Sequence, residues 1–124
     1  IILAAGAVAA FTTIGHFVIG EKQFLIPMLE SNMEDIPKKV MHCMFHYVSA
    51  FLILSTFVLT LTGVGIGLGG DPTLLVRFIA ANFVAFAIWQ IGIAAESGIP
   101  KGIFKLFQWI CCVIIAILSI VGTL

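Results

Sequence analysis

The three histidines of the chain and one of its glutamates are the side chains best suited to chemistry. His16 and Glu21 lie in the stretch GHFVIGEKQ, while His42 and His46 stand four residues apart in MHCMFHY. Residues four apart share one face of an α-helix. Histidine and carboxylate side chains from two helices are a known ligand set for transition metals in helical bundles. These four residues are therefore the candidate metal ligands.

Other chemistry is compatible with the same residues. Two histidines on facing helices can bind haem iron. Because imidazole titrates near neutral pH, His16 and His46 also suit a proton relay, a quinone-type pocket or a transport path. In the simplest interpretation, they form hydrogen bonds with each other, with Glu21 or with a carbonyl group, and so hold helices together. The sequence favours this structural role, in an accessory subunit of a membrane assembly, and leaves the others open.

The composition places these residues in a membrane. The 124-residue chain is 61% hydrophobic and 10% charged, with a formal net charge of zero. A soluble domain of this length needs more polar surface, so the lipid bilayer is the expected partner. The balanced charge offers no basic face for nucleic acid. The first residue is Ile1, inside an apolar run, and we expect the natural N-terminus to lie upstream.

Four apolar stretches have the length of a membrane-spanning helix, which is roughly 20 residues. They cover about residues 1–20, 40–68, 73–95 and 102–124. Because lipid tolerates only backbone whose polar groups are satisfied internally, each stretch is predicted to be helical. The sequence thus predicts one all-α domain over residues 1–124, an integral membrane four-helix bundle.

The segment between the first two spans is predicted to be an amphipathic connector. Residues 22–39 combine apolar side chains with an acidic patch, a pattern typical of a segment that lies at the membrane surface. Pro27 and Pro37 are expected to keep this segment from continuing either span.

Lysine placement predicts the orientation. Five of the six basic residues fall in or beside the two connections on one side of the membrane: Lys22, Lys38, Lys39, Lys101 and Lys105. By the positive-inside rule, these connections face the cytoplasm and both termini lie outside.

The candidate site is predicted at the cytoplasmic side, between the first two spans. At about 1.5 Å per residue, His16 and His46 lie at similar depth in the same half of the membrane. Glu21 lies about 140° round an ideal α-helix from His16. Convergence of these three side chains therefore requires a bend near Gly20, whose missing Cβ permits it.

Two glutamines, one in each of the last two predicted spans, are expected at the same membrane depth as the histidines. Gln90 and Gln108 are predicted at the depth of the histidines, where they would support the ligands by hydrogen bonds. Polar groups at this depth are costly and turn into the bundle.

The sequence resembles a group of small bacterial integral membrane proteins that have four predicted spans and no assigned function. In that group a His-x3-Gly-Glu signature ends the first helix, here residues 16–21. An aromatic-His pair, more often with tryptophan, opens the second helix, and Phe45-His46 matches it. A short Gly/Pro-containing turn precedes the fourth helix, as at residues 98–102. The resemblance implies a bacterial inner-membrane location and favours His16, Glu21 and His46 over His42.

The sequence favours a binding or structural role over catalysis. No Ser-His-Asp or Cys-His nucleophile arrangement can be placed on the predicted spans, and we expect no sizeable soluble part within these 124 residues to hold a polar substrate. Small residues four apart, such as Ala5 with Ala9 and Ala81 with Ala85, predict close helix packing. We expect this close packing either between helices of the same chain or between chains, in a homo-oligomer or a larger membrane complex.

Overall fold

The computed structural model describes residues 1–105 and 107–124, and their side chains except those of residues 103 and 104. In this part of the chain every regular element is a helix. The elements are α1 (Ile2–Gly15), η1 (His16–Leu25), α2 (Ile26–Leu29), α3 (Asp35–Gly63), α4 (Thr73–Glu96), α5 (Gly102–Lys105) and α6 (Gln108–Gly122). The predicted all-α bundle is confirmed.

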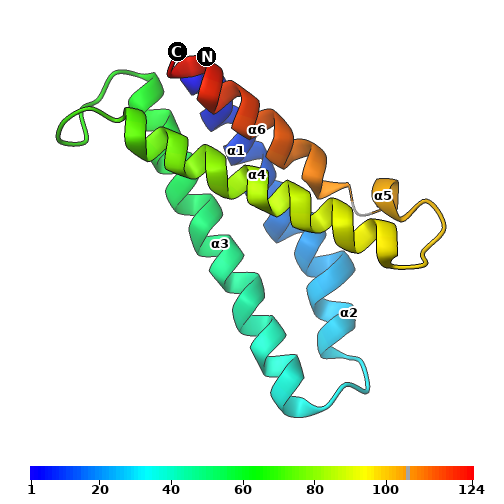
Figure 1. Cartoon of the computed structure of the whole chain (residues 1–124). Coiled ribbons are helices and arrows are strands. Elements are labelled where there is room, and N and C mark those ends of the chain that lie inside the picture. Colours follow the sequence, from blue (N-terminus) through cyan, green and yellow to red (C-terminus); the bar gives the residue numbers. More distant parts are fainter. Residues whose placement is uncertain (106) are drawn as a thin grey trace.

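The helices form two pairs that diverge at one end. α1 packs along α3, α4 packs along α6, and α1 also contacts α6. The two termini lie side by side where the pairs meet (Figure 1). The far ends of α3 and α2 lie well away from the α4–α5 connection, so the pairs open like a V at that end (Figure 1).

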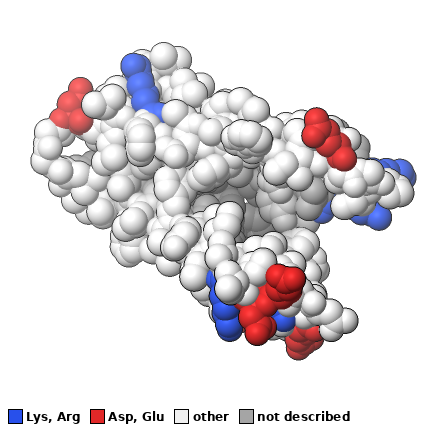
Figure 2. All heavy atoms as spheres, turned by 60° about the horizontal axis from the view of Figure 1, so that its bottom comes forward, with Lys and Arg blue, Asp and Glu red and all other residues white. Residues whose placement is uncertain are grey.

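Length and composition make this a membrane protein. Among the described residues, three helical segments are long and apolar enough to cross a bilayer: Ile2–Leu29, Asp35–Gly63 and Thr73–Glu96. α6 is equally apolar but has only 15 residues, or about 22 Å of helix. Charged side chains gather towards the margins of the molecule, and the surface between them is uncharged (Figure 2).

The first helical segment continues past its predicted end at about residue 20. It runs through η1 and α2 to Leu29, and the next helix begins at Asp35. Pro27 lies in α2 two residues after the end of η1, and the helix continues past it to Leu29 although proline has no backbone N–H to donate. Pro37 lies in the first turn of α3. The predicted connector 22–39 is therefore mostly helical, and its non-helical part is residues 30–34.

The other spans also differ from their predicted bounds. α3 ends at Gly63 rather than near residue 68, and Gly65 follows with a φ of +86°. The last predicted span, 102–124, contains the separate helices α5 and α6. Thus only the third span, α4, follows its prediction closely.

Small residues bring α1 and α3 into backbone contact near the termini. Ala5 and Ala9 are fully buried, as their spacing predicted, whereas Ala81 and Ala85 are exposed. A Cβ on Gly63 would lie only 2.5 Å from Cα of Leu3. The core extends from this contact to fully buried side chains of the other pair, including Val76, Phe83 and Ile115.

Polar side chains fix the start of α4 at the same end. Asp71 accepts hydrogen bonds from the backbone N–H and hydroxyl of Thr73, at 2.9 and 2.7 Å. These bonds hold the pKa of the Asp71 carboxyl below its usual value. Arg77 donates from Nε to the Thr123 hydroxyl at 3.1 Å, and so ties α4 to the end of α6.

Candidate functional site

The element η1 is a π-helix that opens at His16. It runs for 10 residues, longer than the single-turn π-bulges that often mark functional sites. The sequence required a bend near Gly20 for Glu21 to reach the histidines, and the chain instead passes through Gly20 as a π-helix. Gly20 is buried in η1, and the space that a Cβ would take there lies 3.9 Å from Nδ1 of His16.

His16 joins this π-helix to α3. Its Nε2 atom lies 2.8 Å from the hydroxyl oxygen of Ser49, within hydrogen-bond distance. The imidazole also stacks on the ring of Phe45, with centroids 4.1 Å apart and planes inclined by 18°. The contact with Ser49 and the stacking on Phe45 fix the orientation of the His16 ring, and the Phe17 ring meets it edge to face with centroids 5.4 Å apart.

The Ser49 hydroxyl also connects His16 to His46. Nδ1 of His46 lies 3.3 Å from the Ser49 oxygen, and this hydroxyl lies 3.1 Å from the carbonyl oxygen of Phe45. Ser49 is only 4% exposed, whereas His46 is exposed. A single buried oxygen thus bridges the two histidines. His42 is half-buried, with its ring 5.2 Å from that of His46.

Glu21 does not join the histidines. Its side chain is exposed and forms no hydrogen bond to His16 or His46. Among the described residues, no group of three or more histidine, cysteine, aspartate or glutamate side chains could hold a metal ion. Metal or haem ligation by His16, Glu21, His42 and His46 stays a prediction, and the geometry adds no support to it.

The two glutamines predicted to support the histidines bind each other instead. Nε2 of Gln90 donates to Oε1 of Gln108 at 2.6 Å, which joins α4 to α6. Their remaining amide groups form no hydrogen bond with a described residue. Both glutamines nevertheless line the same cavity as His16.

This cavity has a volume of about 470 Å³ and lies where the two helix pairs diverge. The surface of the molecule is hollowed between the two helix pairs (Figure 2). Residues of η1 and of the helices α1, α3, α4 and α6 line it. Its aromatic lining consists of Phe11, Phe24, Phe45, Phe83, Phe86 and Phe107, and its polar lining includes Thr12, His16, Gln90 and Gln108.

The sequence did not reveal Ser49 or the aromatic lining. Ser49 follows His46 by three residues, so it lies on the same side of the helix, and that spacing was the available signal. The six phenylalanines are spread over every span, and their convergence depends on how the helices cross. No local pattern contains that information.

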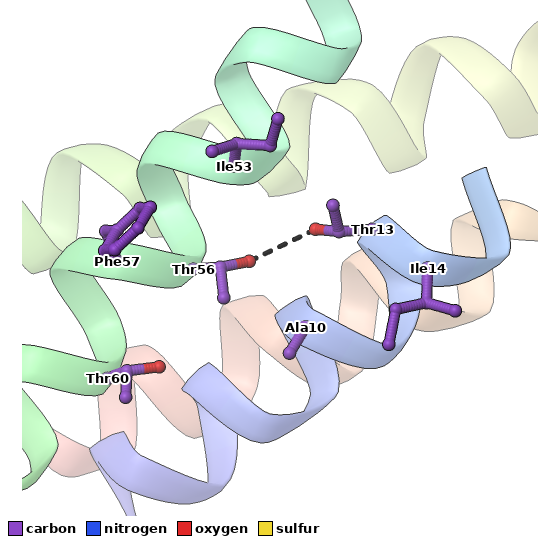
Figure 3. Close-up of a pocket in the computed structure, with 7 residues that line it drawn as sticks. All are labelled: Ala10, Thr13, Ile14, Ile53, Thr56, Phe57 and Thr60. Carbon is purple, nitrogen blue, oxygen red and sulfur yellow. Dashed lines mark hydrogen bonds between the residues drawn. The ribbon is translucent and has the colours of Figure 1, made fainter. Parts of the chain in front are cut away.

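A second cavity lies on the outer side of the α1–α3 pair (Figure 3). It has a volume of about 350 Å³ and is lined by Ala10, Thr13, Ile14, Ile53, Thr56, Phe57 and Thr60. The hydroxyls of Thr13 and Thr56 lie 3.1 Å apart, and each also binds a carbonyl of its own helix at 2.8 Å. Its central hydroxyls are already paired, so the larger cavity is the better candidate site.

Comparison with protein-family models, curated proteins and solved structures found no match. The class defined by fold and composition is an α-helical membrane protein, and its function is inferred from the site itself.

Proposed function

We propose that this membrane protein binds a flat, lipid-soluble ring compound with oxygen substituents, of the quinone or quinol class. The observation that carries the proposal is the cavity of about 470 Å³ between the helix pairs. Its volume falls within the range of roughly 300–1,000 Å³ that is typical of small-molecule sites.

The aromatic lining favours a flat ring. Phenylalanine side chains stack on, or meet edge to face, the rings of a bound compound. Phe83 and Phe86 come from α4 and Phe45 comes from α3, so aromatic groups face the cavity from both helix pairs. An aliphatic chain attached to the ring would extend into the surrounding lipid.

The polar groups favour oxygen substituents on two sides of the ring. His16 lies on the wall formed by the α1–α3 pair, and the Gln90–Gln108 pair lies on the wall formed by α4 and α6. Nδ1 of His16 forms no hydrogen bond to a described side chain. A glutamine amide carries two N–H donors, of which the Gln90–Gln108 bond uses one on Gln90 and none on Gln108. Both walls can therefore donate to ligand oxygens.

Fluorescence of the two tryptophans tests this binding. The probe is an alkyl-substituted hydroxynaphthoquinone, titrated into detergent-purified protein. Trp109 of α6 packs against the hydrophobic core of the bundle, whereas Trp89 is 72% exposed on α4. In a Trp89→Phe variant, we expect saturable quenching of Trp109 as the probe fills the cavity. In a Trp109→Phe variant, we expect Trp89 quenching to rise linearly, because the probe reaches it only by partition into the micelle.

Linear quenching of Trp109 would contradict the proposal. A haem absorption band or near-stoichiometric metal in the purified protein would instead favour the histidines as ligands. The role of an accessory subunit in a larger assembly is compatible with ligand binding and stays a prediction.

We also propose that the open end of the V faces the cytoplasm of a bacterial cell, with both termini outside. The lysines support this orientation, since Lys22, Lys38 and Lys39 lie at or near the α2–α3 connection and Lys101 lies in the α4–α5 connection. A single cysteine placed at Ser31, in a cysteine-free variant, should resist impermeant thiol reagents in intact cells. Rapid labelling there would reverse the orientation.

A further inference from the structure

We propose that His46, Ser49 and His16 form a proton path between the exposed face of α3 and the ligand in the cavity. This inference rests on the proposed function, because the path needs a bound compound with a titratable oxygen at its inner end.

The three side chains form a continuous series of hydrogen-bonding atoms. Nδ1 of His46 lies 3.3 Å from Oγ of Ser49, and that oxygen lies 2.8 Å from Nε2 of His16. The outer residue, His46, is exposed, and the middle residue, Ser49, is buried. The inner residue, His16, lines the cavity. The series therefore leads from an accessible histidine to the ligand site.

The two nitrogens of His16 face different partners. Nε2 is directed at Ser49, while Nδ1 lies on the side of Gly20, where the missing side chain leaves space 3.9 Å away. Gly20 itself lines the cavity. An imidazole can accept a proton at one nitrogen and release another proton from its second nitrogen. His16 is thus placed to pass a proton to a ligand oxygen beside Gly20.

The transfer balances in three steps. The N–H bond at Nδ1 of doubly protonated His46 breaks, and its proton forms an O–H bond with Ser49. The original hydroxyl proton of Ser49, turned away from the Phe45 carbonyl, forms an N–H bond at Nε2 of His16. The proton on Nδ1 of His16 then moves to an oxyanion of the ligand. His46 loses one proton and the ligand gains one, while Ser49 and His16 keep their charges.

Other titratable groups near the path are few among the described residues. Cys111 and Cys112 of α6 line the cavity, and Glu21 of η1 is exposed. His42 lies one turn nearer the charged end of α3, with its ring 5.2 Å from that of His46. The residues that α4 contributes to the cavity are uncharged. The His46–Ser49–His16 series is therefore the hydrogen-bonded connection that these elements offer.

A pH jump on the bound probe tests the path. The hydroxynaphthoquinone changes colour when its oxyanion is protonated, so rapid acidification of the complex reports the rate of proton delivery. Ser49→Ala removes the bridging oxygen without altering the cavity lining. At saturating probe concentration, we expect protonation slowed by roughly 10²-fold, the scale of a positioned proton donor. Ser49→Thr keeps a hydroxyl and should retain the rate.

Two further variants keep the test decisive. His46→Gln interrupts the path at an exposed residue, so it should slow protonation even if Ser49→Ala fails to fold. Tyr47→Phe is the matched control, because Tyr47 is 70% exposed on the same helix and outside the path. Equal rates in wild type, Ser49→Ala and His46→Gln would overturn the path alone. Failure of the wild type to bind the probe would overturn the proposed function and, with it, the path.

Discussion

Replacement of Gly20 by leucine is expected to weaken probe binding by roughly ten- to hundredfold while the protein stays folded. A Cβ at this position would lie 3.5 Å from the Phe45 ring and 3.9 Å from Nδ1 of His16, both ordinary contact distances. The additional carbons of leucine would then occupy the cavity beside His16. Overfilling a packed apolar site costs about 1–3 kcal/mol, and each 1.4 kcal/mol corresponds to about a tenfold change in affinity.

Gly92→Leu provides the matched control. Gly92 is exposed on α4, and nothing lies within 4 Å of the position that its Cβ would take. Saturable Trp109 quenching in the Trp89→Phe background gives the affinity, and thermal unfolding followed by circular dichroism verifies the fold. Gly20→Ala adds only the first carbon and should fall between wild type and Gly20→Leu. Undiminished binding by a folded Gly20→Leu variant would place the ligand outside this cavity.

The arrangement of helices was largely readable from the sequence because lipid restricts the possible structures. Apolar length alone predicts α4, and the Ala5–Ala9 spacing predicts the buried side of α1. Helix ends were less predictable, because proline in a first turn does not stop a helix. Pro37 lies in the first turn of α3, and the first helical segment continues past Pro27 without a break.

The candidate site was predicted only in part. Their similar depth was enough to predict that His16 and His46 lie near each other, because neighbouring antiparallel helices place residues of equal depth side by side. The contact is made through Ser49, a small residue that gives no strong pattern of its own. Glu21 was assigned by its closeness in sequence to His16, but its side chain is exposed.

The two glutamines illustrate a different limit of sequence reasoning. Depth placed Gln90 and Gln108 in the same layer as the histidines, and both do line the cavity with His16. Which of these polar groups pair depends on how α4 and α6 are rotated about their axes. Because α4 packs along α6, the glutamines bind each other at 2.6 Å rather than the histidines.

Single and double substitutions of Gln90 and Gln108 can separate a structural role of this pair from a role in ligand binding. Gln90→Leu or Gln108→Leu alone leaves one amide unpaired in an apolar cavity, and each should destabilise the protein by about 1–3 kcal/mol. The double variant removes both amides, so its loss of stability should be smaller than the sum of the two. The difference is expected to be about 0.6 kcal/mol or more, the average for polar pairs between membrane helices. Unfolding in denaturing detergent measures all four proteins of this cycle.

Probe affinity in the same four proteins shows whether the glutamines also hold the ligand. If the free amide groups of Gln90 and Gln108 hold a ligand oxygen, the double variant loses less stability than the sum of the single variants but shows no such saving in binding, because no amide donor is left on the α4–α6 wall. We expect its affinity to be at least tenfold below that of wild type, which corresponds to about 1.4 kcal/mol for a lost hydrogen bond. Wild-type affinity in the double variant would mean that the glutamines only join α4 to α6. The ligand would then be held by His16 and the phenylalanine rings alone.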